Sequence, residues 1–206
     1  MLKKLYPYEY VQSVFEIDWR RLFESGFRAV IFDIDNTLVF QDEDATSEVE
    51  KLFSSLSKLG FKTVILSNNT EERVKRFLKN IDSPYVCNAY KPFAGGYKKA
   101  LEKLGVSNER TVFVGDQLFT DILGANRAKI PSILVSYIRP KEKARPQFRR
   151  RLESVVLRSY EKKSAFQNRL GGISKNNTSE ISKGVSVQKN LLLTRRPVFS
   201  LYTAKD

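Results

Sequence analysis

One stretch of the chain, Ala29 to Val39, constrains the fold more than any other, because an apolar run passes directly into two carboxylates. It reads AVIFDIDNTLV, so that four apolar residues precede Asp33 and Asp35. A short, uninterrupted apolar run is typical of a strand buried on both faces of a parallel sheet. Carboxylates at the end of such a strand cost free energy to bury unless a partner compensates them. The stretch therefore predicts a buried strand with a polar site at its carboxyl end.

The spacing of Asp33 and Asp35 bears on what that site does. Side chains two residues apart point the same way while the chain stays extended. Two converging carboxylates suit a divalent cation, which prefers oxygen ligands. The alternative is that both residues begin a turn, since Asp and Asn are common in turns. The remaining motifs of the chain have to decide between the two interpretations.

The rest of residues 1–137 alternates expected helices with expected strands. Periodic apolar residues between capping signals predict helices over 18–25, 46–59, 70–80, 94–104 and 118–128. Apolar runs predict further strands over 62–66, 85–87, 111–114 and 132–135. We expect Asn69 to cap the helix over 70–80, and residues 5–17 to form an irregular lead-in. The alternation predicts an α/β, Rossmann-like fold, a parallel sheet with helices on both faces.

Polar residues follow four of the expected strands. They are Asp33 and Asp35, then Ser67 and Asn68, then Lys91, then Asp116 and Asp121. Each group has a plain structural explanation when taken alone: a serine ends a turn, lysine is common in this chain, and an aspartate is favoured in the first turn of a helix. Ligands of parallel sheets bind at the carboxyl ends of the strands. The joint occurrence of the four groups there favours one shared site.

These residues resemble the motifs of the haloacid dehalogenase (HAD) superfamily. The stretch Asp33-Ile34-Asp35-Asn36-Thr37 resembles its first motif, Asp-x-Asp-x-Thr, and the segment GDQLFTD, which ends at Asp121, resembles the fourth. Ser67 and Lys91 stand at the places of the second and third motifs. The resemblance covers residues 29–137. Four segments are similar to those of the YqeG-like phosphatases of HAD subfamily IIIA: FDIDNTLV, LSNN, AYKPF and GDQLFTDILGANR. That group is related to phosphatidylglycerophosphate phosphatases of the mitochondrial and plastid type.

The resemblance implies a catalytic role for three residues. Asp33 would be the nucleophile that attacks phosphorus and forms an aspartyl-phosphate. Asp35 would protonate the leaving oxygen and then activate water. Lys91 would neutralise charge on the nucleophile and the phosphate. The activity implied is that of a Mg²⁺-dependent phosphomonoester hydrolase.

The resemblance also implies ligands for the metal and for the phosphate. Mg²⁺ would be held by Asp33, the backbone carbonyl of Asp35 and Asp116. Asp121 would support the metal or orient Lys91. The phosphate would be bound by Thr37, Ser67 and Asn68.

The segments where HAD enzymes carry cap domains are short in this chain. Residues 38–62 and 69–90 each hold one expected helix and nothing larger. We therefore expect a capless enzyme with an open mouth. An open mouth suits a bulky substrate: a protein, a nucleic-acid end or a phosphorylated head group at a membrane. Phosphatidylglycerophosphate is one substrate that the resemblance implies.

Charge divides the chain near residue 138. Of the net charge of +13, almost all belongs to the end of the chain, because residues 1–137 hold 19 Lys/Arg and 18 Asp/Glu, whereas residues 138–206 hold 17 and 5. We therefore expect a phosphatase domain over 1–138 and a basic C-terminal tail over 139–206, partly helical and partly disordered.

The first part of the tail, residues 139–163, has the pattern of a basic amphipathic helix. Such a helix would lie on an anionic bilayer or bind nucleic acid, or it would dock on the enzyme with a solvated charged rim. Residues 164–190 are expected to be disordered or loosely attached, and 191–193 and 198–202 have no assignment. The apolar face expected for the helix consists of Phe148, Leu152, Val155, Val156 and Tyr160.

Composition excludes several classes of function. The chain has no histidine, which removes Ser-His triads and His-rich zinc sites, and its single cysteine, Cys87, removes an internal disulfide framework. It contains no apolar run of membrane-spanning length and no apolar core of a signal peptide near its first residues. We expect a cytoplasmic enzyme, with attachment to the inner membrane face as the alternative. Two competing functions stay open: a nucleic-acid- or ribosome-associated binding protein on a HAD scaffold, and a phosphatase of soluble metabolites.

Overall fold

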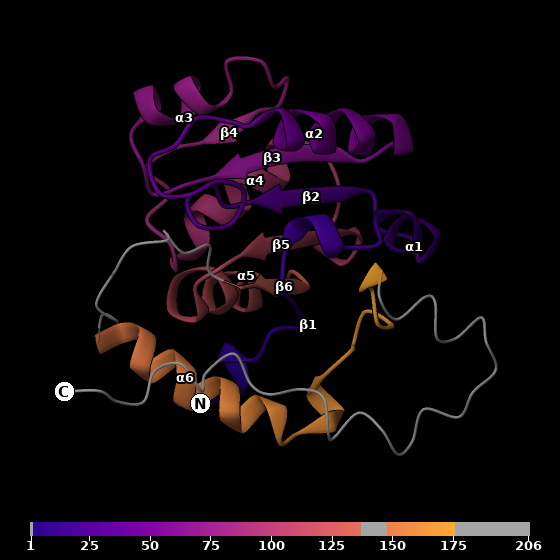
Figure 1. Ribbon diagram of the computed structural model, residues 1–206, viewed down its shortest axis with the longest axis vertical. Coiled ribbons are helices and arrows are strands. Elements are labelled where there is room, and N and C mark those ends of the chain that lie inside the picture. Colours follow the sequence, from indigo (N-terminus) through magenta and orange to yellow (C-terminus); the bar gives the residue numbers. More distant parts are fainter. Residues whose placement is uncertain (1, 137–147, 176–206) are drawn as a thin grey trace.

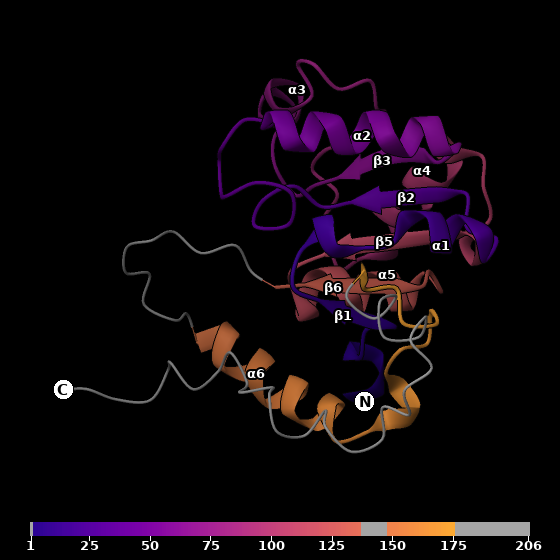
Figure 2. The same ribbon diagram turned by 45° about the vertical axis from the view of Figure 1, so that its right-hand side comes forward.

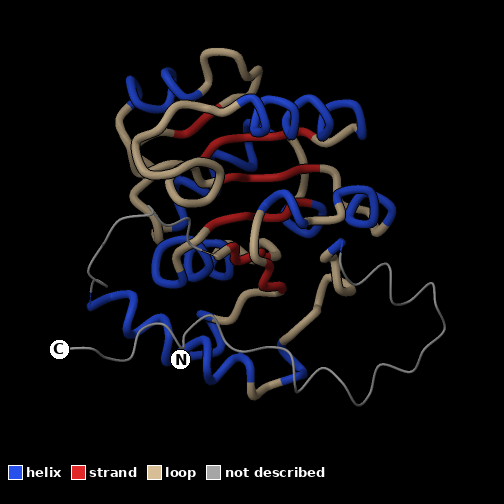
Figure 3. The backbone as a smooth tube through the Cα atoms, in the orientation of Figure 1, coloured by secondary structure: helices blue, strands red, loops and turns tan. Residues whose placement is uncertain are grey.

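The computed structural model describes residues 2–136 and 148–175, which form a parallel sheet with helices on both sides (Figure 3). The strands are β1 (Glu9–Val11), β2 (Ala29–Phe32), β3 (Lys62–Leu66), β4 (Tyr85–Val86), β5 (Thr111–Gly115) and β6 (Ser132–Val135). They lie in the order β1-β6-β5-β2-β3-β4, and all neighbouring pairs are parallel. The expected α/β, Rossmann-like fold is confirmed.

Helices cover both faces of this sheet (Figure 1). The α-helices are α1 (Trp19–Glu24), α2 (Ser47–Leu59), α3 (Glu71–Phe77), α4 (Ala94–Leu104), α5 (Leu123–Arg127) and α6 (Phe148–Glu161). The shorter turns are η1 (Leu2–Leu5), η2 (Val14–Glu16), η3 (Asn108–Arg110), η4 (Leu118–Ile122) and η5 (Ser164–Phe166). Helices α1, α2 and α3 pack on one face of the sheet, and α4 and α5 pack on the other. Residues 38–62 and 69–90 add no domain above the sheet, so the described fold is capless, as expected.

The alternation of side chains along β2 builds both layers of the core. Val30 and Phe32 pack with the α1–α3 side, whereas Ala29 and Ile31 pack with the α4–α5 side. All four residues are fully buried. Strand β2 pairs with β3 on one side and with β5 on the other. The residue after β2, Asp33, therefore emerges in the middle of the sheet's carboxyl edge, toward which the arrows of β2, β3 and β5 point in Figure 1.

Two expectations about local structure are wrong. The cap of α3 is Thr70, whose hydroxyl accepts a hydrogen bond from the Arg73 N–H at 3.4 Å, and not Asn69. Residues 5–17 are not merely an irregular lead-in, because β1 pairs with β6 along Glu9–Val11. A strand of three residues is too short for its alternation to be recognised, and its partner is more than 120 residues away in the chain.

Helix α6 docks on the domain beside the β1 end of the sheet (Figures 1 and 2). Its buried residues Val156, Leu157 and Tyr160 form a cluster with Leu118 and Ile122 of η4. The apolar face expected for this helix is wrong in part, because Leu152 and Val155 are 44% and 62% exposed. The residues that dock, Val156, Leu157 and Tyr160, lie on a face that differs in part from the expected one, because the apolar residues of η4 contact that face.

The chain continues along the β1 edge after α6. The Glu9 carboxylate accepts hydrogen bonds from the backbone N–H groups of Leu170 and Gly172, at 3.1 and 3.0 Å, and Ser174 pairs with Ile17. The expectation of loose attachment is therefore wrong for residues 164–175. Such contacts join residues about 160 positions apart, and no local pattern predicts them. Residues 139–147, 176–190, 191–193 and 198–202 lie outside the described residues.

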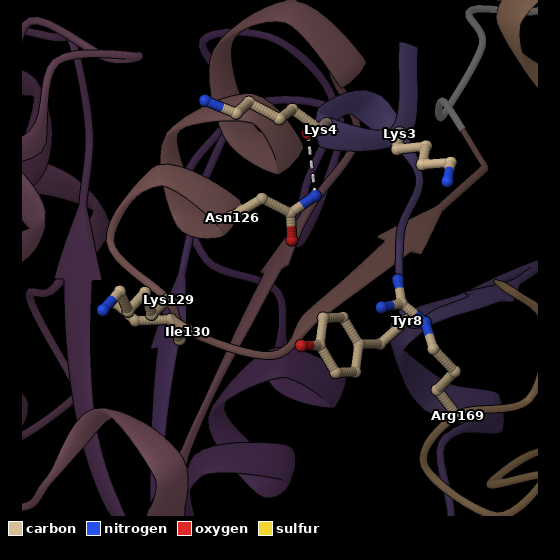
Figure 4. Close-up of a pocket in the computed structure, with 7 residues that line it drawn as sticks. All are labelled: Lys3, Lys4, Tyr8, Asn126, Lys129, Ile130 and Arg169. Atoms are coloured by element: carbon tan, nitrogen blue, oxygen red, sulfur yellow. Dashed lines mark hydrogen bonds between the residues drawn. The ribbon is translucent and has the colours of Figure 1, made fainter. Parts of the chain in front are cut away.

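A basic hollow of about 220 Å³ lies where these segments meet, and Figure 4 shows its lining. Tyr8 and Ile130 each come shortly before a parallel strand, so the hollow is at the amino edge, away from Asp33. The Arg169 guanidinium stacks 3.6 Å from the centroid of the Tyr8 ring and donates to the carbonyl of Pro7 at 2.9 Å. Asn126 donates to the carbonyl of Lys4 (Figure 4). The Arg169 contacts join segments near the two ends of the described chain, and the Asn126 bond joins α5 to η1.

No helix among the residues that the structure describes is long and apolar enough to cross a membrane.

Candidate active site

Three residues from distant parts of the chain meet at the carboxyl edge of the sheet. The Lys91 ammonium donates to Asp33 Oδ1 and to Asp121 Oδ1, at 2.7 Å in both cases. Asp33 follows β2, Lys91 lies between β4 and α4, and Asp121 belongs to η4. All three side chains are almost completely buried. A lysine in such a place is stable as a cation because carboxylates replace its water.

Burial and charge shape the protonation of this cluster. Burial raises the pKa of Asp33 to about 6, against the opposing effect of the Lys91 ammonium. Burial alone would lower the pKa of Lys91, but the carboxylates of Asp121 and Asp33 raise it above its usual value. The ammonium group therefore stays charged at neutral pH, and it holds the Asp33 oxygen in a fixed place.

A third carboxylate completes an acidic cluster that suits a divalent cation. One carboxylate oxygen from each of Asp33, Asp116 and Asp121 lies within 4.8 Å of the others, and all three residues are buried. Hard divalent cations prefer oxygen donors such as these carboxylates. Three carboxylates also exceed the single charge of Lys91. Gly115 makes room for the cluster, since a Cβ there would lie 2.7 Å from the Asp121 side chain.

The Asp35 side chain is bound elsewhere. Its Oδ1 accepts from Arg73 at 2.9 Å and from the Asp42 N–H at 3.1 Å, and its Oδ2 accepts from the Asn69 side chain at 2.5 Å. Arg73 comes from α3, is 8% exposed, and also donates to the Glu43 carbonyl. The Asp35 carboxylate thus does not contact Lys91. It forms an ion pair with Arg73 instead.

The three residues expected to bind phosphate lie at the same edge. Asn68 accepts a hydrogen bond from the Lys91 N–H at 2.7 Å and donates to the Lys91 carbonyl at 3.4 Å, so its amide holds the lysine backbone. Ser67 accepts from the Asn69 N–H at 3.1 Å. Thr37 is buried, and its hydroxyl has no hydrogen-bond partner among the described residues. The Thr37 hydroxyl therefore keeps its hydrogen-bonding capacity for a ligand.

Sequence reasoning missed four residues that support this site. Asn69 and Arg73 hold Asp35, as described above. The Tyr97 hydroxyl donates to the carbonyl of Asp121 at 3.1 Å, and Glu153 accepts from the Leu118 N–H at 3.0 Å. Arg73 resembles any charged residue of an amphipathic helix. Glu153 lies in a segment dominated by basic residues. The sequence around Arg73 and around Glu153 therefore contains no pattern that predicts their contacts.

The sequence of the chain is similar to those of known phosphatases. The haloacid dehalogenase-like hydrolase family matches residues 39–129. The probable phosphatase YqeG of Bacillus subtilis (strain 168) is 35% identical over 169 residues, which is 81% of this chain and 98% of that protein. The phosphatidylglycerophosphate phosphatase 1, chloroplastic/mitochondrial, of Arabidopsis thaliana is 26% identical over 90% of this chain and 55% of its own length.

Solved structures give weaker matches. A crystal structure of an uncharacterized protein from Listeria monocytogenes serotype 4b has a TM-score of 0.45 and 22% identity, and it covers 66% of this chain and 100% of its own. The sequence relatives are the stronger finding, because the B. subtilis protein is similar along nearly its whole length. The chain therefore belongs to the haloacid dehalogenase-like hydrolases, and it is a phosphatase of the YqeG-like group.

Proposed function

We propose that this phosphatase is a Mg²⁺-dependent phosphomonoester hydrolase that works through an aspartyl-phosphate on Asp33. The observation that carries the proposal is the contact of one buried ammonium, Lys91, with both Asp33 and Asp121, beside the third carboxylate of Asp116. Phosphoryl transfer needs an oriented nucleophile and neutralised charge. The cluster supplies both in a place from which water is largely excluded.

Each residue has a defined part in the proposed reaction. A carboxylate oxygen of Asp33 forms a bond to phosphorus while the bond from phosphorus to the ester oxygen breaks, and Asp35 gives its proton to the departing alkoxide. Water then attacks the aspartyl-phosphate, Asp35 takes the proton of that water, and inorganic phosphate leaves with Asp33 restored. Lys91 stays protonated throughout and offsets the charge of the phosphoryl oxygens.

The acidic cluster is the proposed metal site. Asp33, Asp116 and the backbone carbonyl of Asp35 would hold Mg²⁺, and Asp121 would orient Lys91, which it already contacts at 2.7 Å. When bound, the ion supplies further neutralisation of the phosphoryl oxygens. We assign Thr37, Ser67 and Asn68 to the phosphate side of the site, with Asn68 acting through the backbone of Lys91.

We propose a lipid phosphomonoester, of the phosphatidylglycerophosphate type, as the substrate. The absence of a cap over the described fold supports it, as does the similarity to a plant phosphatase named for this lipid. The enzyme would then work at the inner face of a membrane, held peripherally. A soluble metabolite and a nucleic-acid partner are the competing hypotheses, and the basic residues after 138 are what favour the latter.

The first test replaces the nucleophile. Asp33→Asn should abolish phosphate release, a loss of roughly a thousandfold or more, because an amide does not form the acyl-phosphate. The measurement is phosphate release from a panel of lipid, sugar, nucleotide and protein phosphomonoesters with saturating Mg²⁺. The matched control is Asp82→Asn, an exposed aspartate in a loop, which should leave the rate unchanged. Near wild-type turnover by Asp33→Asn would exclude the aspartyl-phosphate route.

A further inference from the structure

Two exposed aromatic side chains flank the catalytic lysine. Tyr90 and Phe93 are 74% and 69% exposed, more than any other large apolar side chain that the structure describes. Lys91, which lies between them in the chain, is 7% exposed and contacts Asp33. In this short turn the Lys91 side chain therefore points into the active site, whereas the rings of Tyr90 and Phe93 are exposed to solvent at the same edge of the sheet.

The turn that carries these rings is held in place. Asn88 and Tyr90 have φ values of 45° and 51°, in the left-handed region that a bulky residue rarely adopts. Hydrogen bonds keep this conformation: from the Lys91 N–H to Asn68 at 2.7 Å, and from the Phe93 N–H to the Tyr90 carbonyl at 2.9 Å. Backbone strain of this kind is concentrated at functional sites. The hydrogen-bonded turn therefore holds both rings in their exposed positions.

The position of the turn indicates which part of a bound substrate lies beside the rings. A phosphate that contacts Lys91 and Asp33 has the buried cluster on one side, so the rest of the ester must point outward, where no cap covers it. The outward part passes the residues next to Lys91. Tyrosine is favoured where an apolar phase meets water, and a phenylalanine ring adds apolar area that such a phase can bury.

The charge around the rings selects an anionic partner. Residues 88–99 contain no acidic residue, and two of their three lysines, Lys98 and Lys99 on α4, are exposed, whereas Lys91 is buried and paired within the site. Basic residues beside aromatic rings favour the surface of a bilayer that contains anionic lipids. We propose that Tyr90 and Phe93 are the residues by which the active-site mouth contacts a membrane and recognises the apolar part of a lipid phosphomonoester. This proposal rests on the phosphatase function proposed above and deepens it.

The variant that tests the proposal is the double substitution Tyr90→Asn with Phe93→Ser. Asparagine tolerates the left-handed conformation of residue 90 better than tyrosine does. Residue 93 is the N-cap of α4 and makes no side-chain capping bond, which serine would supply. Both changes therefore remove a ring without disturbing the turn. The control is Leu2→Ser, which removes an apolar side chain of 50% exposure on η1.

The assay compares two esters of the same head group. One is phosphatidylglycerophosphate in vesicles of phosphatidylglycerol and phosphatidylcholine, and the other is soluble glycerol phosphate. We expect the double variant to lose roughly tenfold or more in kcat/KM on the vesicles and to co-sediment with them less, with less than about a twofold change on the soluble ester. Leu2→Ser should match the wild type on both.

The outcomes separate this proposal from the one on which it rests. Equal rates for the double variant and the wild type on the vesicles would overturn the proposed contact and leave the phosphatase function intact. An equal loss on both esters would also overturn it, because the effect would then act through Lys91. A wild-type chain that hydrolyses only the soluble ester would refute membrane recognition. Hydrolysis of neither ester, nor of any other phosphomonoester in the panel above, would refute the proposed function itself.

Discussion

Asp33 and Asp35 are two residues apart in the chain, yet they have different partners. Lys91 contacts Asp33, whereas Arg73 and Asn69 contact Asp35. The separation gives the two carboxylates different environments, because Asp33 is buried against an ammonium and Asp35 is paired with a guanidinium. The alternative that both merely begin a turn does not account for a buried ammonium and a buried guanidinium, each bound to one of them.

Arg73 has a testable role in positioning Asp35. Arg73→Met should lower kcat by roughly tenfold on alkyl phosphates, because Asp35 would lose its orientation as the acid that protonates the leaving oxygen. The loss should be much smaller on p-nitrophenyl phosphate, whose leaving group needs no proton. The comparison of kcat on the two esters is the measurement.

The control for this prediction lies on the same helix. Arg76→Met removes a guanidinium that is 48% exposed and pairs with Asp42 and Asp44, and surface pairs of this kind contribute little. It should leave both rates unchanged. If Arg73→Met lowered kcat equally on both esters, Arg73 would be maintaining the fold of the site and not the orientation of the acid.

At the scale of elements, α6 and η4 form one supporting unit. Glu153 of α6 accepts the N–H of Leu118, the first residue of η4, and η4 carries Asp121. The second oxygen of Asp121 accepts the Gln117 N–H at 3.0 Å. Helix α6, from the basic end of the chain, therefore helps to position Asp121, which contacts Lys91. A separate tail that only binds a partner would not have this contact.

Substitution of Glu153 should test whether α6 influences the proposed requirement for Mg²⁺. Glu153→Ala removes an acceptor from a buried N–H, which should cost about 1 kcal/mol of unfolding free energy, and should raise the Mg²⁺ concentration for half-maximal activity. Glu153→Gln keeps an acceptor oxygen and should lie closer to the wild type. Thorough chelation should silence all three proteins. Urea unfolding and Mg²⁺ titration are the measurements, and identical results for the two variants would contradict a capping role.

At the scale of the whole molecule, the described fold extends past residue 138. Helix α6 buries Val156, Leu157 and Tyr160 against η4 and β6, and Glu9 binds the backbone of Leu170 and Gly172. The division into a domain over 1–138 and a tail stays a prediction about which part folds alone. These contacts argue that a chain ended at 138 lacks part of its own core.

Truncation tests that division directly. A chain of residues 1–138 should be less stable than one of residues 1–175 by roughly 5 kcal/mol, since each large apolar side chain that is lost contributes about 1.5–3 kcal/mol. That amount is comparable to the whole stability of an ordinary domain. Urea unfolding followed by circular dichroism measures the difference. Equal midpoints and equal slopes for the two chains would show that residues 139–175 are an accessory segment.

The sequence by itself determined the layers of the fold and predicted the residues of the candidate site. Strand β3 and the caps of α1 and α2 follow from apolar spacing and from the hydrogen-bonding capacity of residues such as Thr46, which act over a few positions. Parallel strands bring their carboxyl ends to one edge, so Asp33, Lys91 and Asp116 could be assigned to one site before any distance was known.

Only the tertiary structure decided which partner each group has. The pairing of β1 with β6, the Arg73 contact with Asp35, and the Glu9 contact with Leu170 join residues far apart in the chain. Helix α6 carries apolar residues on more than one side, so its buried stripe depended on the surface that η4 presents. Local patterns carry no information on such contacts, because their free energy exists only once the layers have packed.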